Sequence, residues 1–178
     1  MKKCKILINA ELGLVVGANK KVQESDIDNL PYLHAIVQET LCLHPPAPLL
    51  VPRKAVRDTN FMGYSIPKNT LVMVNYWAIG RDEDSWEDAL SFKPERFLDS
   101  NINYKGSSYE FIPFGSGRRI CPGLPLAHRM IHLILGSLLH HFEWELCDDG
   151  KIIDMTEKMG AGARKLELLQ AIPKRKTT

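Results

Sequence analysis

One ten-residue segment, Phe-Gly-Ser-Gly-Arg-Arg-Ile-Cys-Pro-Gly at residues 114–123, constrains the fold more than any other part of the chain. Its glycines permit tight turns and a close approach of the backbone to a flat ligand. An apolar run at helical spacing follows, and Pro122 suits a first helical turn because its missing N–H is not needed there. Cys121 would therefore lie at the positive end of a helix dipole, beside Arg118 and Arg119, which favours a thiolate. The segment predicts a loop that presents a thiolate ligand.

The order Phe-x-x-Gly-x-Arg-x-Cys-x-Gly resembles the haem-binding signature of the cytochrome P-450 haem-thiolate monooxygenases. Its five fixed positions are met by Phe114, Gly117, Arg119, Cys121 and Gly123. The resemblance implies that these residues bind haem and that Cys121 is the axial ligand of the iron. A phosphate-binding loop would instead end in Gly-Lys-Ser or Gly-Lys-Thr, which does not occur here. The other alternative is a buried structural cysteine in a turn.

The composition is that of a globular protein. The 178 residues are enough for one domain with a core, and they include 44% hydrophobic and 25% charged residues with a net charge of +2. This charge balance does not indicate a nucleic-acid-binding protein, and the basic tail at residues 174–176 is typical of a solvated chain end. Cys4, Cys42, Cys121 and Cys147 show no close pairing, which argues against a zinc knuckle or a disulfide framework and suits a reducing compartment. No apolar run is long enough for a signal peptide or a membrane span.

Apolar residues at helical spacing predict three helices. The first is short, at residues 10–17, and ends at a glycine. The second opens at Pro31 behind capping residues and ends near His44, because the prolines that follow cannot continue it. The third, at residues 124–141, is apolar almost all round, which is typical of a helix buried in a larger protein or a membrane.

Two histidines interrupt the apolar surface of the third helix. His128 and His132 lie four residues apart on one face, which is the spacing of half a zinc site. No acidic residue or second cysteine falls beside them in the sequence. We therefore expect surface or capping histidines rather than metal ligands.

Extended segments are expected between and after the helices. They are predicted at residues 49–54, 56–60, 61–69 (a hairpin), 70–75, 142–146, 151–153 and 166–172. A further short helix is expected within an acidic loop at residues 82–86.

Glu39 and Cys42 lie three residues apart on one face of the second helix. The family pattern here is Glu-x-x-Arg, whose two side chains form a buried ion network with the arginine of a later Pro-Glu-Arg-Phe segment. Residues 94–97 supply that segment and Arg96, whereas Cys42 stands where the family has arginine. Removing one partner from a buried network costs about 3–5 kcal/mol, or about 1–3 kcal/mol if Glu39 still pairs with Arg96. Against a total stability of about 5–15 kcal/mol, such a loss is enough to decide whether haem is retained. The alternative is that Glu39 is an ordinary solvated residue.

The resemblance also places the segment after the prolines beside the substrate pocket above the haem. The residues that would line the pocket are Pro48, Leu49, Leu50 and Val51. Because the side chains of the last three carry no polar group, the pocket suits an apolar substrate. Arg53 would meet a haem propionate, the alternative being a solvated arginine in a hairpin. The turn at residues 159–163 would reach back over the substrate.

The resemblance covers about residues 10–173. It implies a mainly α fold with small β-sheets (α+β), the haem-binding part of the cytochrome P-450 fold, incomplete. Residues 1–178 would form a single partial domain, the C-terminal third of a complete member. Residues 43–48 and 121–129 look most similar to plant microsomal members that act on terpenoids or phenolics in secondary metabolism.

Such a monooxygenase inserts one oxygen atom of O2 into an apolar small molecule, with electrons from NADPH through a flavoprotein reductase. Arg118 and Arg129 are candidate contacts for the reductase. A full-length member would lie on the cytosolic face of the endoplasmic reticulum membrane, held by an anchor that this chain does not contain. The fragment by itself is expected to be inactive. The alternatives are a truncated, catalytically incompetent haem-binding or degenerate product, and an α+β binding module that uses no haem.

Overall fold

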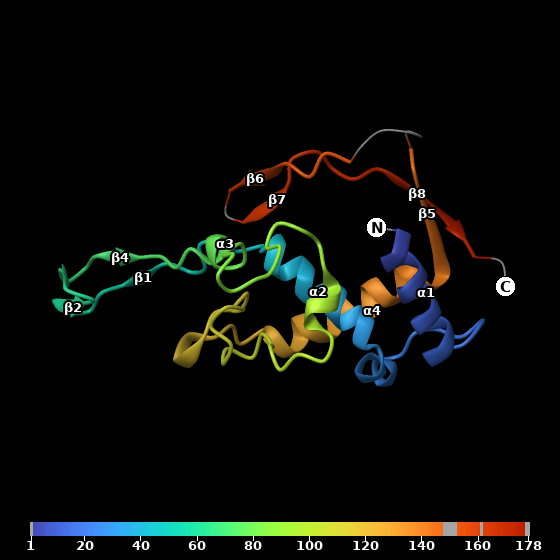
Figure 1. Ribbon diagram of the computed structural model, residues 1–178, viewed down its shortest axis with the longest axis horizontal. Coiled ribbons are helices and arrows are strands. Elements are labelled where there is room, and N and C mark those ends of the chain that lie inside the picture. Colours follow the sequence, from blue (N-terminus) through green and yellow to red (C-terminus); the bar gives the residue numbers. More distant parts are fainter. Residues whose placement is uncertain (1, 148–152, 161, 177–178) are drawn as a thin grey trace.

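The computed structural model describes residues 2–147, 153–160 and 162–176 (Figure 1). These residues form helices α1 (Lys2–Val15), α2 (Pro31–Leu43), α3 (Tyr76–Ile79) and α4 (Leu124–His141), with short 3-10 helices at Glu24–Asn29, Pro94–Phe97 and Gly117–Arg119. The strands pair as two-stranded antiparallel sheets. The predicted class, mainly helical with small β-sheets, is confirmed. No helix in the described ranges is long and apolar enough to cross a membrane.

Helices α1, α2 and α4 pack against one another and enclose one of two hydrophobic clusters. Ile8 and Leu12 of α1 meet Leu30 and Leu33 at the start of α2. Gly136 lets α4 approach closely, because a Cβ built there would lie 3.3 Å from a methyl carbon of Leu33. The second cluster includes residues from the middle and end of α2, such as Val37 and Leu41, and is rich in aromatic residues from the segments between α3 and α4.

Two of the three predicted helices have the predicted bounds, and for the remaining helix the predicted first residue is wrong. Helices α2 and α4 agree with the sequence pattern, but α1 begins at Lys2 rather than at residue 10. The reason is that the buried Ile8 lies one turn before the buried Leu12, so the buried face of the helix extends towards the N-terminus beyond residue 10. The expected helix at residues 82–86 is a series of turns, in which the Trp86 N–H donates to the Asp82 carbonyl at 2.9 Å.

An extended arm of four short strands follows α2 and projects away from the helices (Figure 1). Strand β1 (Arg53–Lys54) pairs with β4 (Leu71–Val72), and β2 (Thr59–Phe61) pairs with β3 (Tyr64–Ile66). A hairpin is present here, but it spans residues 59–66 rather than the predicted 61–69, and the predicted strands were too long. Residues 47–50 form a turn in which Leu50 has a φ of +50° and its N–H bonds the Ala47 carbonyl, so extended pairing begins only at Arg53.

The strands after α4 form two further pairs. Strand β5 (Phe142–Leu146), predicted at these residues, pairs with β8 (Ala171–Arg175), and β6 (Glu157–Met159) pairs with β7 (Ala163–Lys165). The strand predicted at residues 166–172 begins too early, because the register Leu146 to Ala171 fixes where β8 starts. Of the strand predicted at residues 151–153, Ile153 is not in a strand and the other two lie outside the described residues.

The β6–β7 hairpin returns to the proline segment that follows α2. The Ala163 N–H donates to the Pro46 carbonyl at 2.9 Å, and a Cβ built on Gly162 would lie 2.7 Å from the same oxygen. Glu157 accepts hydrogen bonds from the His44 ring at 2.7 Å and from the Trp77 indole at 3.4 Å. These contacts fix the C-terminal hairpin against the segment that was predicted to border a substrate pocket.

Candidate functional site

The loop at residues 111–123 is shaped by two glycines in the left-handed region. Gly115 has a φ of +74° and Gly117 a φ of +67°, values that a residue with a side chain adopts only at a cost. The Gly115 N–H donates to the Ile112 carbonyl at 2.8 Å, and the Cys121 N–H donates to the Phe114 carbonyl at 3.0 Å. These bonds close the loop on itself and bring Cys121 to the start of α4, as the sequence predicted.

Cys121 is half-buried and lies just before the first turn of α4. Its Sγ atom would be 3.7 Å from a Cβ built on Gly123, so a side chain at that position would touch the sulfur. A Cβ built on Gly115 or Gly117 would meet nothing within 4 Å, so the loop has open space beside its glycines. A thiol on a glycine-lined loop with open space beside it fits a flat group whose iron takes a soft sulfur ligand.

Two contacts hold this loop to the protein interior. The half-buried ring of Phe114 lies against the buried Tyr104, with 5.7 Å between ring centroids. The Ser116 hydroxyl donates to the Gly106 carbonyl at 2.7 Å. By contrast, the side chains of Arg118 and Arg119 are exposed. Of the signature residues, Phe114 therefore connects the loop to the aromatic cluster, whereas the charged side chain of Arg119 is exposed to solvent.

The structure brings Glu39 and Arg96 together at the centre of the protein. Glu39 is 1% exposed, and its Oε2 lies 3.1 Å from the Nε of Arg96. The Nε–H is directed at the Lys93 carbonyl, so Oε2 accepts no hydrogen bond from the described residues, whereas Oε1 accepts one from the Lys93 N–H at 2.8 Å. Burial raises the pKa of Glu39, and the Lys93 N–H and the Arg96 charge oppose the rise. Glu39 is thus a buried ion-pair partner, and the alternative of a solvated residue is wrong.

Arg96 does more than pair with Glu39. Its guanidinium donates to the carbonyls of Glu87, Asp88 and Ser91 at 3.0, 3.3 and 2.9 Å. The half-buried guanidinium of Arg96 therefore connects α2 to the irregular segment at residues 87–91, which the sequence pattern did not predict.

Cys42 is 2% exposed and fills a tight space beside this pair. Its Sγ–H is 3.6 Å from the Gly80 carbonyl, and a Cβ built on Gly80 would come to 2.4 Å from the Cys42 carbonyl oxygen. Burial raises the pKa of the Cys42 thiol to about 12, although the charges of Arg96 and Arg81 oppose the rise. Cys42 is therefore a neutral thiol and supplies no charge to Glu39.

The four residues assigned to the substrate pocket do not share one environment. Pro48 is buried and its carbonyl accepts the Trp77 N–H at 3.0 Å. Leu50 is half-buried, whereas Leu49 and Val51 are 41% and 80% exposed. Arg53 is also exposed, on strand β1 of the arm. The described residues thus present an open apolar surface here rather than an enclosed pocket.

The histidine pair of α4 differs from the expectation. His132 is 0% exposed, so it is not a surface histidine, and a third histidine, His34 of α2, lies against both rings. Sequence reasoning missed His34, because ninety-four residues separate it from His128 and no local pattern joins them.

The loop presents a thiol at a helix N-terminus, and the buried Glu39 of α2 pairs with Arg96 of the 3-10 helix Pro94–Phe97. These two features define the kind of protein expected from the signature. A family model described as cytochrome P450 matches residues 6–171. The chain belongs to the cytochrome P450 family. Membership implies a haem cofactor.

Named relatives are plant proteins. Cytochrome P450 76A1 of Solanum melongena is 57% identical over 170 residues, 94% of this chain and 36% of that protein. Geraniol 8-hydroxylase of Catharanthus roseus is 52% identical over 166 residues, 92% of this chain and 34% of that protein. A 7-ethoxycoumarin O-deethylase of Helianthus tuberosus is 52% identical over 167 residues, with 92% and 34% covered. The chain thus spans about a third of the length of these curated relatives.

A solved structure shares the same arrangement. A zebra fish cytochrome P450 determined with abiraterone superposes with a TM-score of 0.87 at 31% identity, over 99% of this chain and 40% of that one. The arrangement of α1, α2, α4 and the small sheets is therefore that of a part of the cytochrome P450 fold.

Proposed function

We propose that this chain is the C-terminal, haem-binding third of a haem-thiolate monooxygenase, in which Cys121 supplies the axial ligand of the iron. The observation that carries the proposal is the half-buried Cys121 on a loop with two left-handed glycines, directly before α4. Cys121 precedes the N-terminus of the 18-residue helix α4, which is the positive end of the helix dipole.

A thiolate-ligated haem supplies the activation of O2, because the sulfur pushes electron density to favour O–O cleavage. The residues of this chain hold and shield the group. Phe114, Gly117 and Gly123 shape the loop around the sulfur, and the guanidinium of Arg119 is available for electrostatic contact. Arg53, exposed on β1, would pair with a haem propionate, as arginine pairs well with carboxylates.

The substrate we propose is an apolar small molecule, a plant terpenoid or phenolic of secondary metabolism. Support comes from two sources: relatives named geraniol 8-hydroxylase, iridoid oxidase and 7-ethoxycoumarin O-deethylase, and the apolar residues after the prolines. Pro48, Leu49, Leu50 and Val51 would form one wall, and the β6–β7 hairpin that contacts Pro46 would lie next to it. The wall would become enclosed only when other parts of the enzyme cover its exposed residues.

Electrons would come from NADPH through a flavoprotein reductase on the cysteine side, with the complete enzyme on the cytosolic face of the endoplasmic reticulum. Arg118 is exposed and suits an acidic partner, whereas Arg129 already forms an ion pair with Glu24. Charge reversal at Arg118 should therefore slow reductase-supported turnover at low salt more than reversal at Arg129. Equal turnover in the wild type and Arg118→Glu would exclude that contact.

A second candidate, a catalytically incompetent haem-binding or degenerate product, is favoured by the observation that Cys42 gives Glu39 no charge partner. If the missing cation limits haem retention, Cys42→Arg should raise the fraction of protein that keeps haem through gel filtration. Equal retention by wild type and Cys42→Arg would remove this argument for incompetence.

The test of the main proposal is the carbon monoxide difference spectrum of the reduced, haem-supplemented chain. We expect a strongly red-shifted Soret band that is lost in Cys121→Ala and kept in Cys147→Ala, a control at an exposed cysteine. A band that survives in Cys121→Ala would refute the assignment of the ligand. Absence of the band from the wild type would show that these 178 residues alone do not form the thiolate complex, and would favour the second candidate.

A further inference from the structure

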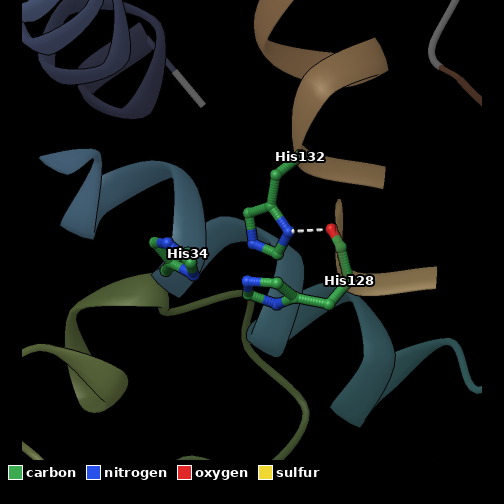
Figure 2. Close-up of side chains that lie close together, drawn as sticks. All are labelled: His34, His128 and His132. Atoms are coloured by element: carbon green, nitrogen blue, oxygen red, sulfur yellow. Dashed lines mark hydrogen bonds between the residues drawn. The ribbon is translucent and has the colours of Figure 1, made fainter. Parts of the chain in front are cut away.

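Three histidines from distant parts of the chain meet where α2 packs on α4. His34 lies on the first turn of α2, and His128 and His132 lie roughly one and two turns into α4. Figure 2 shows the three rings gathered in one group. Ring centroids are 4.2 Å apart for His34 and His132, 4.4 Å for His128 and His132, and 5.2 Å for His34 and His128. One ring nitrogen from each lies within 4.8 Å of the other two.

The hydrogen bonds of the outer ring nitrogens decide which nitrogens are left to bind a ligand. His132 Nδ1–H donates to the His128 carbonyl at 2.6 Å (Figure 2), so its Nε2 carries the lone pair. His34 Nε2–H donates to the Ile27 carbonyl at 3.0 Å, so its Nδ1 carries the lone pair. Metal-binding histidines ordinarily donate their other N–H to a carbonyl in this way, which fixes the tautomer and the ring orientation.

The Nδ1 of His128 is hydrogen-bonded to the Tyr104 hydroxyl, which can donate or accept. When Nδ1–H is the donor to this hydroxyl, Nε2 carries the lone pair, as in a metal-binding histidine. His34 and His128 are half-buried, so an ion can reach the group from solvent. The nearby Asp28 carboxylate adds negative charge and Lys105 adds positive charge, so the local field is mixed.

An independent observation points to a ligand at the centre of the group. His132 is 0% exposed, and its Nε2 has no hydrogen-bond partner among the described residues. A buried nitrogen without a partner costs about 1–3 kcal/mol, and a bound ion is one of the accepted explanations for such a group. Burial also lowers the pKa values of His128 and His132, which keeps both rings in the neutral form that binds metals.

We propose that His34, His128 and His132 bind one Zn²⁺ ion through three imidazole nitrogens, with a fourth position open to solvent. Zinc accepts histidine nitrogens at about 2.0–2.1 Å, which places tetrahedral ligand atoms about 3.3 Å apart. One ring nitrogen of each histidine already lies within 4.8 Å of the other two, and we expect side-chain rotation to bring the lone-pair nitrogens to that spacing. The ion would join α2 to α4 at a site separate from Cys121, and the inference does not depend on haem binding.

The variants can be matched so that each removes a ligand and keeps the outer hydrogen bond. Asparagine places an amide N–H near the Nδ1 position of histidine, so His132→Asn and His128→Asn remove Nε2 alone. Glutamine places it near Nε2, so His34→Gln keeps the bond to Ile27 and removes Nδ1. His140→Gln is the control, because this histidine of α4 bonds the Lys20 carbonyl through Nε2 and lies outside the group.

The experiment is a titration of the full 178-residue chain with Zn²⁺, with and without added haem, followed by calorimetry and by thermal unfolding. We expect one equivalent of Zn²⁺ to bind and raise the melting temperature, with no effect of Mg²⁺. Each ligand variant should lose at least about 100-fold in affinity, since even the loss of a second-shell partner costs 10–100-fold. His140→Gln should bind like the wild type. Circular dichroism shows which variants fold. If His132→Asn does not fold, His34→Gln, at a half-buried position, is the variant that tests the site.

Thiols are the competing ligands, and Co²⁺ distinguishes them from histidines. Co²⁺ bound to imidazoles gives visible d–d bands without the near-ultraviolet charge-transfer band of a thiolate complex. We expect the d–d bands in the wild type and in Cys121→Ala, and their loss in His132→Asn or His34→Gln. Binding that follows the cysteine variants instead, equal affinity in the histidine variants, or no preference for Zn²⁺ over Mg²⁺ would each overturn the proposal.

Discussion

Substituting Arg96 should destabilise the protein much more than substituting its partner Glu39, although the two form one ion pair. In Arg96→Met, the carboxylate of Glu39, 1% exposed, keeps only the hydrogen bond from the Lys93 N–H. A buried charge that loses its partner costs about 3–5 kcal/mol. The substitution also leaves three carbonyls of residues 87–91 without the guanidinium that they now contact.

The reverse substitution leaves no buried charge without a partner. In Glu39→Gln, the amide oxygen can still accept from the Lys93 N–H, and Arg96 keeps its three carbonyl acceptors. The loss is then one charge-assisted contact, about 1–3 kcal/mol. The asymmetry between the two variants should therefore be about 2 kcal/mol, and the double variant should be less destabilised than the sum of the single ones.

Urea unfolding followed by far-ultraviolet circular dichroism measures these differences as changes in the midpoint at constant slope. Because the total stability of a domain is only about 5–15 kcal/mol, Arg96→Met is expected to be close to unfolded without urea, or to show no cooperative unfolding transition. Arg118→Met is the control for removing an exposed arginine, and its effect should stay within about 0.5 kcal/mol. A cost for Glu39→Gln that equals or exceeds that for Arg96→Met would refute the reasoning.

Three further predictions concern stability and use the same unfolding assay. Gly80→Ala should lower the free energy of unfolding by about 3 kcal/mol, because its Cβ would lie 2.4 Å from the Cys42 carbonyl oxygen. Gly13→Ala, in open space on α1, should instead raise it by about 0.5–1 kcal/mol. Equal effects of the two substitutions would contradict the packing argument. Gly117→Ala should cost about 1–2 kcal/mol because φ is +67°, and a neutral result would show that the loop relaxes. Burial raises the pKa of Glu39, so the folded state binds this proton more tightly than the unfolded state does. Stability relative to Glu39→Gln should therefore rise as the pH falls from neutrality towards the ordinary pKa of glutamate, and a constant difference would contradict the sign.

The parts of the fold that could be predicted are those whose signals are local. Helix α2 was recognised because Pro31 opens it, an apolar stripe follows and prolines end it, and all of these lie within one segment. The turn at the thiol loop could be predicted because glycine is favoured where φ is positive, as at Gly115 and Gly117. Strand lengths were not readable in this way, because the pairing partner decides where a strand begins, as Ala171 pairs with Leu146.

The parts of the site that could not be predicted depend on contacts between distant residues. Arg96 was expected to meet Glu39 through the family resemblance, but its three bonds to the carbonyls of residues 87–91 have no sequence pattern. Similarly, His34 has no signal of its own on α2, and it gains a role only because α2 packs on α4. The four pocket residues were predicted from their order in the chain, which does not specify how much of each is exposed.

The apolar residues of α4 divide into two sets with different explanations. The side that carries Ile131 and Leu135 packs against the aromatic cluster, and Gly136 allows close contact with α2. Every fourth residue on another side, Leu126, Met130, Ile134 and Leu138, is 38–68% exposed. A solvated face does not select large apolar side chains at four successive helical positions, so contacts among the described residues account for only part of the pattern. Because the curated relatives are about three times as long, the exposed stripe is the surface at which the remaining part of a complete cytochrome P450 would be expected to contact α4.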